Sequence, residues 1–172
     1  MKKYIIGQKG STLVILLLTT SVILIIGTAA LYLSSLNYKM KTLNSQVKKA
    51  FYYAEAGIDE AYVKTIEFVN EAINYAEEKV DDNMEDNDLH RIYNSVFRSY
   101  IKGKCDDNKS NKGLISVLND NTSYLIYKEG YPKINAKLKE SENNYIVEIN
   151  SVYVKDKIKK EIAMKCVINI PE

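Results

Sequence analysis

The chain has little of the residue chemistry on which most enzyme sites depend. Its 172 residues include one histidine, His90, with two cysteines, seven glycines and two prolines. No glycine-rich phosphate loop, nucleophile elbow or metal-spaced set of histidines and cysteines is present. His90 lies off the apolar face of its predicted helix, without a Ser, Cys or Asp constellation, so we expect it to be exposed. The sequence therefore predicts a protein that is not an enzyme and takes no cofactor and no metal.

A large excess of charge of one sign is also missing. The chain has 24 Lys plus Arg against 22 Asp plus Glu, so no contact with nucleic acid is evident. The acidic run 81–88 (DDNMEDND) lacks the glycine and the final glutamate of a calcium loop, which favours a simple turn. Glu55 and Asp59 lie four residues apart, and we interpret them as part of a solvated helix face.

Charged residues are absent from one long stretch, residues 10–38. Residues 11–33 within it are long enough to cross a bilayer as a helix, which needs about 20 apolar residues. A helix is also the one state in which a single segment satisfies its own backbone in hydrocarbon. No proline occurs in residues 11–80, so we expect one uninterrupted helix there. The sequence predicts a protein anchored in a membrane.

The residues before this stretch do not have the order of a secretory signal. A secretory signal is cleaved after its apolar region, whereas here Gly10 stands before it, at the end of the leader MKKYIIGQKG. This order is similar to that of a type IV prepilin, whose peptidase would cut between Gly10 and Ser11 and leave the helix in place. The alternative is an uncleaved signal anchor in which Gly10 is only a flanking residue.

A second motif follows about forty residues later, in residues 50–62 (AFYYAEAGIDEAY). Together with the Lys-Gly junction and the apolar helix, it resembles the PilX-type minor pilins over residues 9–62. The resemblance implies a non-catalytic subunit of a type IV pilus-like machine for adhesion, secretion or DNA uptake. It also implies cleavage, N-methylation, a head outside the cytoplasmic membrane, and as partners the prepilin peptidase, major and other minor pilins and the inner assembly platform. The alternative is a single-pass, membrane-anchored extracytoplasmic binding module that enters no filament.

The chain departs from the pattern of such pilins at the fifth residue after the expected cleavage site. Most of them carry Glu there, thought to neutralise the terminal amine of a neighbouring subunit, but this chain has Ile15. An unpaired charge in an apolar filament core costs several kcal/mol. The departure therefore predicts a minor, tip or initiation subunit rather than the repeating shaft subunit.

Two stripes of residues run along the expected helix. The first consists of small residues at spacings of four, three and four, which suits close helix packing: Ala50, Ala54, Gly57 and Ala61. Either a neighbouring subunit's helix or the chain's own sheet would cover it. The second is an amphipathic stripe of larger residues, which we expect to carry a globular head: Ile58, Tyr62, Ile66, Val69, Ile73, Ala76 and Val80.

The rest of the chain predicts a small α+β head with a pilin-like plan. We expect a second helix over 89–102, with Asp88 as its N-cap and Gly103 as its stop, and then a loop over 105–113. Three to five antiparallel strands should follow, packed on the second half of the long helix. The strand candidates are residues 114–118, 123–128, 133–139, 145–154 and the alternating run 162–170.

The predicted organisation divides the chain into five parts. These are a leader (1–10), a transmembrane or filament-core helix (11–38), its continuation into the head (39–80), a loop, helix and loop (81–113) and an antiparallel sheet (114–172). Cys105 and Cys166 would lie on an oxidising side of the membrane. Their sequence positions do not show whether they are close enough to bridge, so a disulfide and two free thiols both stay open.

Overall fold

The computed structural model describes residues 8–80, 86–105, 112–125, 132–141 and 143–170, in two compact units, Met1–Gln46 and Val47–Glu172. The fold is α+β and pilin-like, as expected: a long N-terminal helix and a three-stranded antiparallel sheet that packs against its later part. The helices are α1 (Gln8–Glu78), α2 (Asp86–Lys102) and α3 (Leu114–Asn119), with a short 3-10 turn at Asn121–Ser123. The strands are β1 (Lys133–Glu140), β2 (Asn144–Lys155) and β3 (Ile158–Asn169).

The first unit is the N-terminal stretch of α1. Residues 11–46 are helical throughout, and all of their side chains are exposed. This stretch contains the one helical segment, among the described residues, that is long and apolar enough to cross a membrane. Its composition therefore supports a single-pass membrane anchor.

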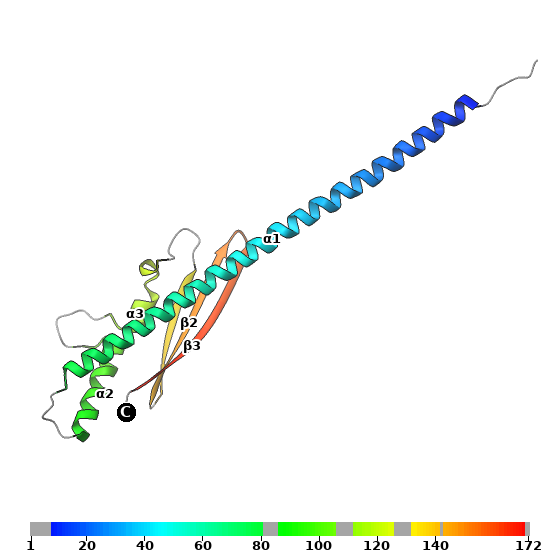
Figure 1. Cartoon of the computed structure of the whole chain (residues 1–172). Coiled ribbons are helices and arrows are strands. Elements are labelled where there is room, and N and C mark those ends of the chain that lie inside the picture. The colour runs from blue at the N-terminus through cyan, green and yellow to red at the C-terminus, as the bar shows by residue number, and fades with distance from the viewer. Residues whose placement is uncertain (1–7, 81–85, 106–111, 126–131, 142, 171–172) are drawn as a thin grey trace, which may run out of the picture. The chain divides into compact units, whose positions relative to one another are not determined.

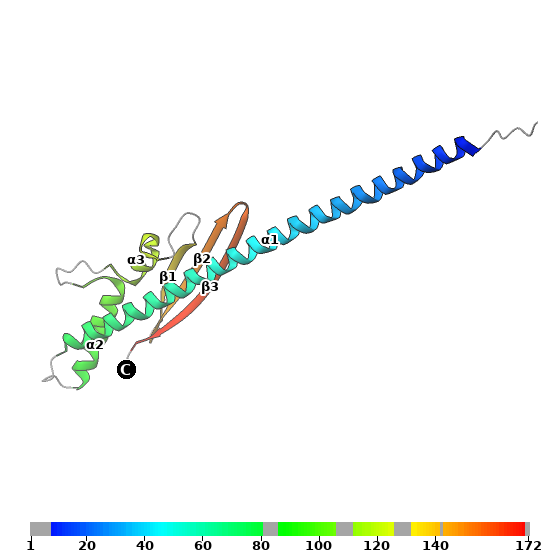
Figure 2. The ribbon, with the colours of Figure 1, turned by 45° about the horizontal axis from the view of Figure 1, so that its top comes forward.

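The second unit is built on a meander of three strands in the order β1-β2-β3. The ladder between β1 and β2 runs from Lys133 opposite Val152 to Glu140 opposite Tyr145, and β3 pairs with β2 along its whole length. Asp156 and Lys157 join β2 to β3 with positive φ angles of 49° and 70°, as a two-residue hairpin turn of the primed type requires. Figures 1 and 2 show the strands lying alongside the later part of α1.

The core lies between one face of this sheet and one stripe of α1. Every second residue of β2 is buried there, from Tyr145 through Val147 and Ile149 to Tyr153. Helices α2 and α3 also contribute buried residues to the core. Its remaining fully buried members are Ala61, Ala72, Ala76, Phe97, Ile101, Leu114 and Leu118.

The helix boundaries differ from those expected at two places. α1 ends at Glu78 rather than Val80, and α2 begins at Asp86, so Asp88 lies inside the first turn and is not the N-cap. An acidic side chain is favourable in that turn because the helix dipole is positive at the N-terminal end. Asp88 therefore marked the start of α2 to within one turn. The stop at Gly103 is confirmed, with a φ of 71°.

The first two strand candidates are wrong for the residues described. Residues 114–118 form helix α3, because Leu114 and Leu118, four positions apart, are both buried on one side of it. Ser123 ends the 3-10 turn and Tyr124 is extended but unpaired, and 126–128 lie outside the described residues. The three later candidates are strands, although β3 begins at Ile158 rather than Ile162.

The stripe of larger residues on α1 enters the core of the head only in part: Ile58 and Ala76 are buried, and Val69 and Ile73 pack against the core. Tyr62 and Ile66 are 45% and 43% exposed, whereas Ala61, Thr65 and Phe68 beside them are buried. Small residues bring the helix axis closer to the sheet than isoleucine and tyrosine would allow. Tyr62 and Ile66 therefore lie on the flank of the helix–sheet contact.

Candidate functional site: the apolar stretch of α1 and the helix–sheet seam

The apolar stretch of α1, residues 11–43, presents large side chains around its whole circumference. Ile15 is 57% exposed, Leu24 is 68% exposed and Leu31 is 73% exposed. Soluble monomers rarely expose a contiguous apolar surface of this extent, so such a surface marks contact with lipid or with other apolar helices. The exposed stretch is therefore the first functional feature of the chain.

Four hydroxyl groups in the middle of this stretch bond to carbonyls of the helix itself. The Thr20 hydroxyl donates to the Leu16 carbonyl at 2.6 Å, and the Thr28 hydroxyl donates to the Leu24 carbonyl at 2.9 Å. Thr19 and Ser21 bond back in the same manner. In hydrocarbon no water replaces a missing partner, so these bonds make the stretch compatible with a membrane interior.

The predicted processing site lies at the N-terminal end of α1. The helix begins at Gln8, so the backbone of Gly10 is helical, and the side chain of Ser11 is exposed. Residues 1–7 of the expected leader lie outside the described residues. The structure thus describes the chain on both sides of the expected Gly10–Ser11 cleavage but not most of the leader.

The small-residue stripe forms a seam with the chain's own sheet. Gly57 is the point of closest approach: a Cβ added there would lie 2.8 Å from Pro132 Cγ and Ser151 Oγ, and 3.0 Å from Ile134 Cδ1. Ser151, whose neighbours on the same face of β2 are larger, provides part of the space. The seam requires glycine because no side-chain atom fits between the helix and the sheet.

The seam continues at both ends of this contact. Ala50 and Ala54 are buried with Tyr153, and Tyr53 stacks on Tyr153 with ring centroids 5.3 Å apart. Ala61 is buried in the larger cluster of the core. All four predicted helix-packing residues therefore pack within the head, and of the two alternatives for this stripe, the chain's own sheet covers Ala54 and Gly57.

Two asparagines seal the outer edge of β1. The Asn121 amide accepts from the Ile134 N–H at 2.6 Å and donates to the Ile134 carbonyl at 3.2 Å. Asn119 makes the same pair of bonds with Ala136, at 2.7 and 3.2 Å. The two side chains replace the hydrogen bonds of a fourth strand, which removes the pairing capacity of an open edge.

Sequence reasoning missed this seal and interpreted Asn119-Asp120-Asn121 as a turn. The available signal was the spacing, because asparagines two positions apart match the two-residue repeat at which one strand edge presents its backbone groups. Asp120 does make a turn: its side chain accepts bonds from the backbone N–H and the hydroxyl of Thr122. The segment therefore makes a turn through Asp120 and covers the edge of β1 through Asn119 and Asn121.

The main charged cluster of the head centres on Glu140 at the end of β1. Its carboxylate accepts from Lys102 at 2.7 Å and Arg98 at 3.0 Å. The hydrogen bond from Lys102 is the largest of the effects that hold the pKa of Glu140 below its usual value. The Tyr145 hydroxyl also donates to Glu140 at 3.3 Å, and burial raises the pKa of Tyr145 to about 12. The cluster ties α2 to the sheet and contains no acid–base pair suited to catalysis.

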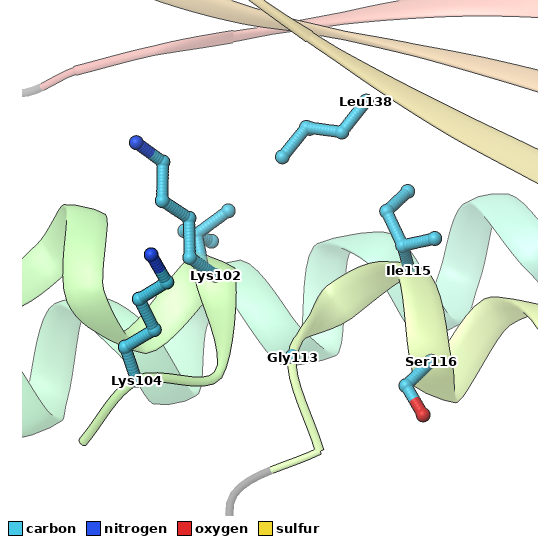
Figure 3. Close-up of a pocket in the computed structure, with 7 residues that line it drawn as sticks. Lys102, Lys104, Gly113, Ile115, Ser116 and Leu138 are labelled. Carbon is cyan, nitrogen blue, oxygen red and sulfur yellow. The ribbon is translucent and has the colours of Figure 1, made fainter. Parts of the chain in front are cut away.

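A pocket lies beside this cluster, between the end of α2, α3 and β1 (Figure 3). Lys102, Lys104 and Ser116 supply its polar side chains, and Ile115 and Leu138 supply apolar ones. The Lys102 ammonium is engaged by Glu140. The pocket therefore offers one partnered ammonium, a second from Lys104 and a hydroxyl, without a nucleophile–base arrangement.

The remaining candidate residues are not brought together. Cys105 and Cys166 are not joined by a disulfide, and burial raises the pKa of Cys166, which lowers the fraction of reactive thiolate. His90 is exposed, as expected, and so are Glu55 and Asp59. Within the described ranges no group of three or more His, Cys, Asp or Glu side chains is placed to hold a metal ion. Residues 81–85 of the acidic run lie outside the described residues.

Comparisons with known proteins add no relative to this description. No protein-family model, no curated protein and no solved structure matches the chain significantly.

Proposed function

We propose that the chain is a minor pilin or pseudopilin, a non-catalytic assembly subunit of a type IV pilus-like machine for adhesion, secretion or DNA uptake. The observation that carries the proposal is the division of one helix into two stretches. Residues 11–46 of α1 expose their apolar side chains, whereas residues 47–78 seat a three-stranded head. A subunit that is stored in a membrane and then moved into a sheaf of helices needs an apolar surface that both environments can cover.

The resemblance of residues 9–62 to PilX-type pilins supplies the direction of insertion and the partners. The leader lies in the cytoplasm and the head lies on the outer side of the cytoplasmic membrane. The prepilin peptidase removes residues 1–10, and the N-terminus of Ser11 is methylated. Major and other minor pilins and the inner assembly platform then contact the exposed stretch of α1.

Mass spectrometry of the mature protein's N-terminus tests this proposal. We expect a chain that begins at Ser11, and a Gly10→Val variant that remains uncleaved but still inserts into the membrane. Gly7→Val is the matched control, because it places the same bulk in the leader away from the cleaved bond. A wild-type chain that retains Met1 would contradict the proposal and favour the membrane-anchored binding module.

Ile15 places the subunit at the tip or at initiation rather than along the shaft. Its side chain is apolar and exposed, and it supplies no carboxylate for a neighbour's terminal amine. Immunogold labelling of the head should mark filament ends, and Ile15→Glu should increase labelling along the shaft. Dense labelling of the whole length of wild-type filaments would contradict tip placement while leaving the pilin assignment intact.

A further inference from the structure

The two edges of the sheet differ in their hydrogen bonding. The side chains of Asn119 and Asn121 occupy the outer edge of β1. Along β3, over the part of the chain that the structure describes, backbone hydrogen bonds run to β2 alone. β3 is 12 residues long, so its outer side presents a row of unpaired N–H and C=O groups. Such a row is a template for another strand.

The surface on the helix side of this open edge is mainly apolar, with one lysine, Lys160, opposite Tyr153. Ile158, Ile162, Met164 and Cys166 of β3 point to the core face but are only half-buried. Glu60 and Lys64, on one flank of α1, bond to Leu125 and Ser123, which precede β1. The opposite flank, with the exposed Tyr62 and Ile66, therefore lies on the side of β3. A strand added to β3 would find apolar contacts on that side.

The solvent side of the same edge presents a lysine. Glu148 of β2 accepts from Lys139 of β1 at 2.9 Å and from Lys165 of β3 at 3.2 Å. The Glu148 carboxylate thus pairs with two lysines, one on each neighbouring strand. Lys165 is the lysine at the open edge, and its side chain is 71% exposed. An acidic residue on an added strand would pair with it, as opposite charges do across strands.

We propose that the outer edge of β3 binds an extended segment of a different protein chain, which adds as a fourth strand. Backbone hydrogen bonds supply the affinity, and alternate side chains supply the specificity. The segment carries apolar residues on the side of Ile162, Met164 and the flank of α1, and an acidic residue beside Lys165. The binding requires no filament, so it is separable from the function proposed above.

A second copy of this chain fits the edge poorly. Antiparallel pairing of β3 with β3 puts the later parts of both α1 helices on one face but in opposite directions. Val47, which follows the apolar stretch of each chain, would then lie at opposite ends of the paired sheet, although both chains enter one membrane. Parallel pairing turns one copy over, which sets Glu161 and Lys165 of one copy beside Ile162 and Met164 of the other. Pairing of β3 with β1 is blocked by Asn119 and Asn121. The occupant is therefore a different chain.

Photo-crosslinking in the native membrane tests the proposal with the full-length protein. Benzoylphenylalanine replaces Ala163, which is exposed in the middle of β3, or Asn135, its counterpart on the sealed strand β1. We expect position 163 to give an adduct with another protein, mapped by mass spectrometry to a segment with alternating apolar residues and an acidic residue. We expect no such adduct from position 135. An adduct with a second copy of this chain, equal adducts from both positions, or none from position 163 would overturn the proposal.

Charge reversal supplies a matched pair of variants for the same assay. Lys165→Glu and Lys139→Glu each remove one ion pair with Glu148 and place a like charge beside it, so their intramolecular effects are similar. Only Lys165 lies at the open edge. The adduct from position 163 should fall about fivefold or more in Lys165→Glu and stay unchanged in Lys139→Glu. An equal fall in both variants would show that the head was damaged and would overturn the assignment of the edge.

Hydrogen exchange gives a readout that does not depend on crosslinking chemistry. Amides of β3 that point to the open edge should exchange quickly in the full-length protein purified alone in detergent, and slowly in the complex isolated from its membrane. The Ile134 and Ala136 amides, already bonded to asparagine, should exchange equally in both. Equal exchange of β3 in the two preparations would overturn the proposal.

Discussion

The two stretches of α1 differ in the side chains that they expose and bury. Residues 11–43 expose leucines, isoleucines and valines, while residues 47–78 bury alanine, glycine and threonine against the sheet and leave Tyr62 and Ile66 half-exposed. In this helix, an unbroken run of exposed large apolar side chains marks a surface for lipid or another chain. Contact with the chain's own head uses mainly small residues, with Ile58 and Phe68 as buried large ones. Hydrophobicity alone would assign the two roles the other way round.

The physical reason is the distance at which a helix meets its partner. A lipid tail adapts to any side chain, so size carries no penalty in the first stretch. A sheet has a fixed surface, and at Gly57 a proline ring, a serine hydroxyl and an isoleucine methyl lie within 3.0 Å of the position of a Cβ. Protein interiors are packed to near crystal density, so even one added carbon there has a cost.

The strongest test of the comparison places the same substitution in both stretches. Gly57→Ala should destabilise the head by about 2–3 kcal/mol, because the added methyl overpacks the seam. Gly27→Ala meets no atom within 4 Å and should stabilise the helix by up to about 1 kcal/mol, the difference in helix propensity. Thermal unfolding of the full-length protein in detergent, followed by near-UV circular dichroism of its tyrosines, measures the head.

A loss of head stability in Gly57→Ala, with no such loss in Gly27→Ala, would sharpen the comparison. A neutral Gly57→Ala would break it, because the head would then tolerate a wider gap between α1 and the sheet. Ala54→Leu offers a second probe of the same seam, since Ala54 is fully buried beside Tyr153. It should lose a similar free energy of unfolding, about 1–3 kcal/mol.

Much of the fold could be predicted because its signals are local. The charge-free run indicates the apolar stretch of α1, and alternation of apolar residues indicates β1 and β3. Gly103 marks the end of α2 at a positive φ angle. Each of these signals depends on residues within a few positions of one another, and each element follows.

The errors arise where distant residues decide the structure. Residues 114–118 are apolar enough for a strand, but the core of the head takes Leu114 and Leu118 from one side of a helix. The choice between a neighbour's helix and the chain's own sheet for Gly57 depends on Pro132 and Ser151, more than 70 residues away. The seal on β1 depends on pairs 13 and 17 residues apart. Spacing within a segment contains no information about such partners.

A second test compares polar contacts in the two stretches of the molecule. Asn121→Ala leaves the N–H and carbonyl of Ile134 without their partner at a partly buried site, so the head should lose about 1–2 kcal/mol. Thr28→Val removes a hydroxyl that bonds only within its own helix, so the head should be unaffected. The same tyrosine signal measures both, and an unchanged melting temperature in Asn121→Ala would show that water replaces the seal.

The smallest expected effect is a dependence on alkaline pH that belongs to the head alone. Burial raises the pKa of Tyr145 in the folded protein to about 12, from 10.0, so the folded state favours the neutral phenol. This contribution to stability is complete below about pH 10 and is lost as the pH rises towards 12, because the unfolded chain then ionises first. At pH 11 the loss should be about 1 kcal/mol. Tyr145→Phe should reduce the slope of the stability profile between pH 10 and 12, and Tyr124, whose pKa burial also raises, should maintain the rest. Tyr38→Phe, at a residue that is 74% exposed in the first stretch, should leave the profile unchanged. Helix content measured in the far-UV should persist in residues 11–46 while the head unfolds, since this stretch has no buried titratable group. Simultaneous loss of both signals would contradict the independence of the two stretches of α1.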